Sequence, residues 1–165
     1  MQRPVLALFA LFAIVAFVAC SGDDTARPTP APTASVGAPL RSLSLIGSTR
    51  TAEVKVEIAS TFEERAVGLM FRQSLPTDTG MLFIYPDDQT SGHWMRNTYI
   101  PLDIAYVDAR GLVIEVRQGK PLDETPLRPQ KPYRFALEMT VGWFESHALG
   151  QEIRIVIPKD LPVAK

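Results

Sequence analysis

The chain has 165 residues, with 17 basic and 18 acidic side chains and a formal net charge of −1 at pH 7. This balance, without a stripe of lysine or arginine, excludes the electrostatic surface with which proteins bind nucleic acid. The only cysteine is Cys20, which excludes an intramolecular disulfide, so the folded domain has to be stabilised by its core alone.

The first 20 residues predict an exported, lipid-anchored protein. Arg3 precedes an apolar run from Val5 to Ala19, which suits a signal peptide and is short for a spanning helix of roughly 17–25 residues. The run ends in Phe17-Val18-Ala19-Cys20, which resembles the lipobox of bacterial lipoproteins, where the signal is cut before a cysteine that takes a diacylglycerol. We therefore expect a signal peptide over residues 1–19, lipidation of Cys20, and a domain in the periplasm or on the cell surface. An ordinary cleaved signal with an incidental cysteine, or a retained transmembrane anchor, is the alternative.

Residues 20–50 are expected to form a disordered tether after the lipidated cysteine. The stretch from Thr25 to Thr33 is rich in proline, threonine and alanine and has no large apolar group. Such a segment cannot bury enough surface to offset its ordering entropy, and its prolines favour an extended spacer. Leu43, Leu45 and Ile46 stand near the domain boundary and can already contact it. One β domain is expected over 51–158, followed by a tail over 159–165.

The first part of the domain predicts a strand followed by a short helix. Residues 53–58 alternate polar and apolar side chains, with the apolar ones facing the core. Ser60 and Thr61 offer helix N-caps, because Glu63 and Glu64 follow each of them at capping-box spacing. Apolar residues at helical spacing extend this helix to about Met70.

The rest of the domain predicts further short strands. A buried strand at 81–85 is stopped by proline, and the pair 103–107 and 112–116 forms a hairpin around Gly111. A proline-rich surface loop follows at 120–132, then a strand at 133–139, a helical turn at 143–149 and a last strand at 152–157. Many short strands with one or two short helices predict a mainly β fold, either a jelly-roll-like sandwich or an open barrel.

Several blocks, in this order, resemble one known family. They are Gly68-Leu69-Met70-Phe71-Arg72, Gly80-Met81-Leu82-Phe83, Trp94-Met95-Arg96-Asn97-Thr98 with Pro101-Leu102-Asp103, and Leu137-Glu138-Met139 with Gly142. Together they resemble the family catalogued as domain of unknown function 192 (DUF192), found in bacteria and archaea, over roughly Val54 to Ile157. The resemblance implies a mainly β, jelly-roll-like domain that is often exported, and it implies no established activity. His93 lies outside the family motif.

The block around Trp94 is the predicted wall of a binding pocket. It combines an aromatic ring, a cation, an amide, a hydroxyl and a carboxylate, which is the chemistry of sugar and carboxylate recognition. We therefore predict a non-catalytic ligand-binding or accessory module, with no cofactor and with a small molecule or an envelope polymer as its ligand. The candidate ligand-binding residues are Arg72, Trp94, Arg96, Asn97, Thr98, Asp103 and Glu138.

The two carboxylates of this set leave alternatives open. Asp103 stands between apolar neighbours, so it is either a functional acid or a structural acceptor for backbone N–H groups, and it can also pair with Arg72 or Arg96. Glu138 faces the opposite side of its strand from Leu137 and Met139, toward solvent or toward a pocket. An envelope hydrolase that divides acid and base work between Asp103 and Glu138 is the alternative function. A further reading treats the block as structural, with function on the 120–132 loop.

Metal and nucleophile chemistry receive little support from the sequence. His93 and Met95 point to one face of an extended segment, with Trp94 opposite, which leaves a Cu(I) site as a minor alternative to the expectation of no metal. His147, in the predicted helical turn, is expected at the surface. The sequence contains no serine on a nucleophile elbow, so a serine–histidine–acid triad is not predicted.

Overall fold

The computed structural model describes residues 39–165. The predicted signal peptide, the lipidation of Cys20 and the part of the tether up to residue 38 lie outside the described residues. Within residues 39–165, no helix has the length and apolar character needed to cross a membrane.

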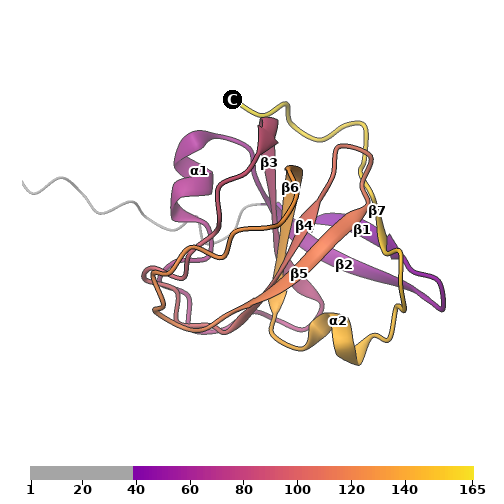
Figure 1. The fold of residues 1–165 in the computed structure, drawn as a ribbon, viewed down its shortest axis with the longest axis horizontal. Helices are drawn as coiled ribbons and strands as arrows, with labels where there is room; N and C mark the ends of the chain where they lie inside the picture. The colour runs from indigo at the N-terminus through magenta and orange to yellow at the C-terminus, as the bar shows by residue number, and fades with distance from the viewer. Residues whose placement is uncertain (1–38) are drawn as a thin grey trace, which may run out of the picture. The chain divides into compact units, whose positions relative to one another are not determined.

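One curled sheet of seven strands forms the domain (Figure 1). Its strand order is β5-β4-β6-β3-β2-β1-β7, and neighbouring strands are antiparallel except for the parallel pair β2 and β3, which α1 connects. The prediction of a mainly β fold with two short helices is confirmed, in the open-barrel form. The elements are β1 (Arg41–Ile46), β2 (Thr51–Ala59), α1 (Phe62–Val67), β3 (Thr79–Gln89), β4 (Leu102–Val107), β5 (Val113–Gly119), β6 (Tyr133–Thr140), α2 (Trp143–Ser146) and β7 (Arg154–Val156).

The two edges of the sheet meet at one end of the barrel. The Val113 N–H donates to the Ile153 carbonyl at 2.8 Å, and the Ile155 N–H donates to the Gly111 carbonyl at 2.8 Å. Gly111 has φ of 85°, in the left-handed region that glycine adopts without strain. The hairpin turn between β4 and β5 therefore covers the short last strand.

The ordered domain begins before the predicted boundary at residue 51. Strand β1 lies within the range assigned to the tether and pairs on one side with β2 and on the other with β7. Its Leu43 and Leu45 alternate with polar residues and are buried in the core. The burial of these two side chains explains why the segment joins the sheet, so any tether ends before Arg41.

Two other element boundaries differ from the prediction. Helix α1 ends at Val67, because Gly68 adopts φ of 49° and turns the chain, so Gly68 closes the helix instead of lying inside it. Strand β3 continues past Pro86 to Gln89, since its pairing register with β6 shifts between Ile84 and Gln89. A bulge of this kind accommodates a proline that cannot donate to the ladder.

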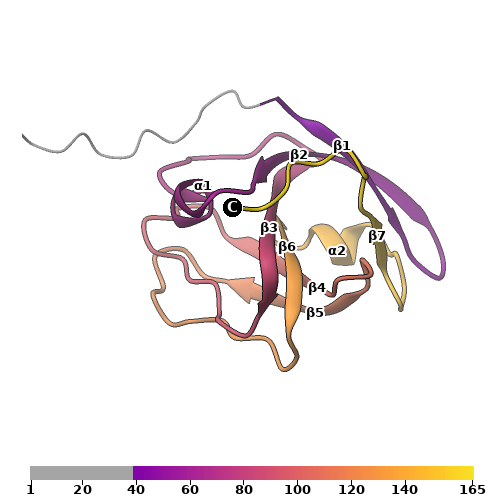
Figure 2. The same cartoon turned by 90° about the horizontal axis from the view of Figure 1, so that it is seen from above.

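The sheet carries a separate apolar cluster on each face. One cluster fills the inside of the curl and includes Leu82, Leu137 and Met139 together with side chains of β1, α2 and β7. Figure 2 shows the sheet curving around α2, with β7 as one of its edge strands, while α1 lies on the other side of β3 and β6. The second cluster, which includes Phe83, Met95 and Tyr106, lies on that outer face. Because side chains alternate along each strand, neighbouring residues belong to different clusters.

Candidate functional site

A pocket of about 120 Å³ lies on the outer face, between α1 with the turn that follows it and the segment around His93. A capping box fixes the start of α1: the Glu64 N–H donates to the Thr61 hydroxyl at 3.2 Å, and the Thr61 N–H donates to the Glu64 carboxylate at 2.9 Å. That backbone hydrogen bond from Thr61 holds the pKa of Glu64 below its usual value. At the other end, Gly68 lies so close to the Phe83 ring that a β-carbon would stand 3.0 Å from it. The pocket is lined by residues 65–70, Phe83, Tyr85, Gly92, His93, Trp94, Thr98 and Glu138.

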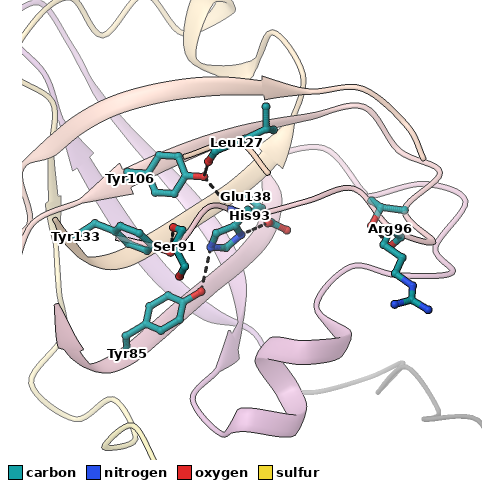
Figure 3. Close-up of polar contacts among 9 residues, drawn as sticks. Tyr85, Ser91, His93, Arg96, Tyr106, Leu127, Tyr133 and Glu138 are labelled. Atoms are coloured by element: carbon teal, nitrogen blue, oxygen red, sulfur yellow. Dashed lines mark hydrogen bonds and ion pairs between the residues drawn. The ribbon is translucent and has the colours of Figure 1, made fainter. Parts of the chain in front are cut away.

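A buried histidine–glutamate pair forms part of the pocket wall (Figure 3). His93 Nδ1 lies 2.7 Å from Glu138 Oε1, and the two side chains are 8% and 7% exposed. Since a carboxylate only accepts, Nδ1 carries a hydrogen. His93 Nε2 lies 3.0 Å from the Tyr85 hydroxyl. Burial raises the pKa of Tyr85 far above its usual value, so the phenol stays protonated where it hydrogen-bonds to His93 Nε2.

Two further tyrosines hold the segment that carries His93. The His93 N–H donates to the Tyr106 hydroxyl at 3.2 Å, and that hydroxyl in turn donates to the Leu127 carbonyl. The Tyr133 hydroxyl donates to the Ser91 carbonyl at 3.0 Å. Burial raises the pKa of both phenols, so both remain donors. The imidazole is therefore fixed in position by its backbone as well as by its ring nitrogens.

The second oxygen of Glu138 has no such partner. Oε2 accepts no hydrogen bond from any residue between 39 and 165, and the ion-pair partner of this carboxylate within that range is His93 alone. Buried polar atoms are nearly always hydrogen-bonded to protein, water or a ligand. Oε2 is not among the fully buried unpartnered side-chain atoms of residues 39–165, so it faces the open pocket, where an external donor can reach it.

Arg72 and Arg96 do not pair with either carboxylate of the predicted set. Both terminal nitrogens of Arg72 donate to the Glu57 carboxylate, one of them at 2.8 Å, and this hydrogen bonding raises the pKa of Arg72. The guanidinium of Arg96 instead lies 5.4 Å from the centre of the Trp94 ring, and Figure 3 shows it directed away from His93 and Glu138. Glu57 was not among the predicted site residues, although the alternation of its strand places its side chain on the other face from the core-facing valines.

The Asn97–Thr98 part of the block shapes a turn. Asn97 adopts φ of 53°, a conformation that asparagine tolerates better than most residues, and its carbonyl accepts from the Phe71 N–H at 2.8 Å. The Thr98 hydroxyl donates to the Arg96 carbonyl at 3.2 Å. Of the seven predicted ligand-binding residues, the pocket wall contains Trp94, Thr98 and Glu138, while Arg72, Arg96, Asn97 and Asp103 lie outside it.

Asp103 lies on the other face of the sheet from Glu138. In the β4–β6 register Asp103 stands opposite Met139, which belongs to the inner cluster, and Glu138 stands opposite Ile104, which belongs to the outer one. The Asp103 carboxylate is 2% exposed and accepts from the Gln118 side chain at 3.3 Å and from the Phe144 N–H at 3.4 Å. The two carboxylates therefore do not converge on a substrate, which contradicts the geometry that the hydrolase alternative requires.

The copper alternative also lacks a suitable geometry. Both ring nitrogens of His93 are engaged, and Met95 is buried with its sulfur packed against Gly119. Residues 39–165 contain no group of three histidine, cysteine or carboxylate side chains placed to hold a metal ion.

His147 is half-buried and not simply at the surface as predicted. Its ring stacks on Trp143 at 4.0 Å, its Nδ1 donates to the Trp143 carbonyl at 2.8 Å, and its Nε2 lies 3.2 Å from Asp78. The Ser146 hydroxyl donates to the same Trp143 carbonyl at 2.9 Å. Both the Ser146 hydroxyl and His147 Nδ1 use their hydrogens to bond to this carbonyl. These residues and Asp78 therefore hold α2 in place and do not form a nucleophile with its base.

Comparison with known proteins assigns the family. The chain is similar to a solved protein of unknown function from Novosphingobium aromaticivorans, with 31% identity and a TM-score of 0.70 over 74% of this chain and 89% of that one. It is also similar to a putative transcription regulator from Sinorhizobium meliloti, with 27% identity and a TM-score of 0.69 over 73% and 95% of the two chains. No curated protein matches. The family model of DUF192, described as uncharacterized ACR, matches residues 45–157, and the chain belongs to this family.

Proposed function

We propose that this DUF192 domain is a ligand-binding module whose site is the pocket between α1 and the His93 segment. The observation that carries the proposal is the buried Glu138 carboxylate, which binds His93 through one oxygen and leaves the other without a partner. The second oxygen is not among the fully buried unpartnered side-chain atoms of residues 39–165, so it is open to the pocket, where a ligand can bond to it. The site is also rigid before binding, which reduces the entropy lost on association.

Binding fits the pocket better than catalysis does. The Tyr85 phenol is stabilised in its protonated form by burial, which opposes its use as a nucleophile. Its hydroxyl also occupies His93 Nε2, the nitrogen that would otherwise act as a base. A second carboxylate is absent from the pocket wall, because Asp103 lies on the opposite face. These groups are arranged to hold a ligand in place.

An unbiased thermal-shift screen tests the proposal. A compound that binds only the native state raises Tm by mass action, and we expect at least one class of compounds to do so for the wild-type domain. The shift should disappear in Glu138→Gln and persist in Glu63→Gln, which removes an equal charge from the exposed side of α1. A screen whose hits all stabilise Glu138→Gln as strongly as the wild type would place binding elsewhere.

We further propose that the domain is tethered to a membrane through a lipidated Cys20 and faces the periplasm or the cell surface. The support is the apolar run from Val5 to Ala19 that ends at the only cysteine. Several buried acyl chains would hold the protein firmly, at about 0.8 kcal/mol per CH₂. Expression in a bacterial host should give a membrane-associated protein with the mass of an acylated N-terminus. Cys20→Ala should lose both properties and Ser21→Ala should keep them; a wild type found soluble and unmodified would refute the anchor.

A further inference from the structure

We propose that the ligand of this pocket presents a protonated amine to Glu138. The inference rests on the proposed binding function and adds the chemical class of the ligand. It depends on three features of the pocket: which donors are already used, what charge remains, and how much space is available.

The hydroxyl and imidazole donors in the pocket wall are already bonded to the protein. His93 Nδ1–H donates to Glu138 at 2.7 Å, the Tyr85 hydroxyl lies 3.0 Å from His93 Nε2, and the Thr98 hydroxyl donates to the Arg96 carbonyl at 3.2 Å. None of these groups has a second hydrogen to direct at Glu138 Oε2. The ligand therefore has to bring the donor.

The charge of Glu138 favours a cationic donor over a neutral one. A largely buried carboxylate such as Glu138 is stabilised by a positive charge placed beside it. Arg65 also lines the pocket, but its Nη1 donates to the carbonyls of Ser60 and Ile84, and it forms no ion pair with Glu138. An ammonium group supplies both the hydrogen bond and the opposite charge, and charge-assisted hydrogen bonds are about twice as strong as neutral ones.

The size of the pocket limits what enters it to a compact head group. Its volume of about 120 Å³ is small beside the roughly 300–1,000 Å³ of pockets that take drug-sized ligands. Apolar side chains, including Leu69, Met70 and Phe83, form much of the remaining wall. Trp94 is 44% exposed, so the larger part of a ligand can leave the pocket past its ring.

The direct test is an NMR titration that follows the indole N–H of Trp94, with ethylammonium chloride as the cationic probe. Ethanol, acetate and glucose serve as neutral and anionic controls. We expect saturable shifts with ethylammonium only, and a dissociation constant at least about tenfold weaker in Glu138→Gln. Glycine, Nα-acetyl-lysine amide and glucosamine then distinguish the sources of the amine, because each presents it on a different body.

A second variant keeps the test decisive if Glu138→Gln does not fold. Met70 is only partly buried and lines the pocket, so Met70→Lys should place an ammonium of the protein itself beside Glu138. We expect Met70→Lys to abolish ethylammonium binding and Met70→Leu to retain it. Equal binding by both variants refutes the assignment. If only acetate or glucose shifts Trp94, the amine is refuted and the binding site stands; if neither these probes nor any hit of the thermal-shift screen shifts it, both proposals fail.

Discussion

The Asp103 carboxylate is expected to stabilise the fold and to leave ligand binding unaffected. It accepts one hydrogen bond from the Gln118 side chain and one from the Phe144 N–H, at 3.3 and 3.4 Å. At these lengths each bond contributes about 1 kcal/mol, so Asp103→Ala should lower the free energy of unfolding by about 2 kcal/mol. For a domain of this size the loss corresponds to a fall in Tm of about 8 °C.

Asp103→Asn provides the matched variant. Its amide oxygen can still accept from the Phe144 N–H, and Gln118 can rotate its own amide to accept from the new NH₂ group. We therefore expect a loss of less than about 1 kcal/mol. Urea denaturation followed by tryptophan fluorescence measures both variants, and the amine titration measures their binding. Since Asp103 and Glu138 lie on opposite faces of the sheet, the reasoning is refuted if Asp103→Asn remains fully stable and loses binding.

Three further sets of substitutions test separate parts of the structure. Gly80→Ala should lower the free energy of unfolding by more than about 2 kcal/mol, because its methyl group would overlap the Glu138 carbonyl oxygen of the neighbouring strand. Chemical denaturation measures this loss, and a variant as stable as the wild type would contradict the expectation. Glu57→Leu and Arg72→Met should each cost about 2–4 kcal/mol of unfolding free energy, whereas the two combined should cost far less than the sum, which a double-mutant cycle measures. The pKa of Glu64 is lower in the folded state than in the unfolded state, where it is about 4.3. The carboxylate therefore stabilises the folded state fully above pH of about 4.3, and this stabilisation is lost as the pH falls through the lower native pKa. Glu64→Gln should therefore flatten the decline in Tm below pH 4.5, and an unchanged decline would exclude this carboxyl as its source.

Local patterns in the sequence were sufficient for most of the fold. The alternation around Val54 and Val56, the capping box at Thr61 and the turn at Gly111 each lie within a few residues, and each formed the predicted element. Strand β1 was assigned to the tether although Leu43 and Leu45 alternate with serines, because the segment is short and follows the proline-rich stretch. It pairs with β2 on one side and with β7 on the other, and the pairing with β7 is a contact that no local pattern encodes.

Predicting the site would have required the pairing register of the strands as well as the alternation of side chains along each strand. The sequence correctly placed Glu138 opposite its apolar neighbours, but the relation between Asp103 and Glu138 depends on how β4 is aligned with β6. A shift of one residue would have put both carboxylates on the same face. The pairing of His93 with Glu138 was likewise out of reach, because the two residues are 45 positions apart in the chain.

The meeting of the two sheet edges also constrains the order of folding. Strand β7 pairs with β1 and bonds to the turn at Gly111, so the barrel cannot close until the last strand is available. Contacts between the two ends of a domain raise its contact order and slow its folding. A nascent chain that lacks residues 153–155 would expose the apolar interior around Leu43 and Leu45. This topology favours folding after synthesis is complete, as the export proposed above for this chain would require.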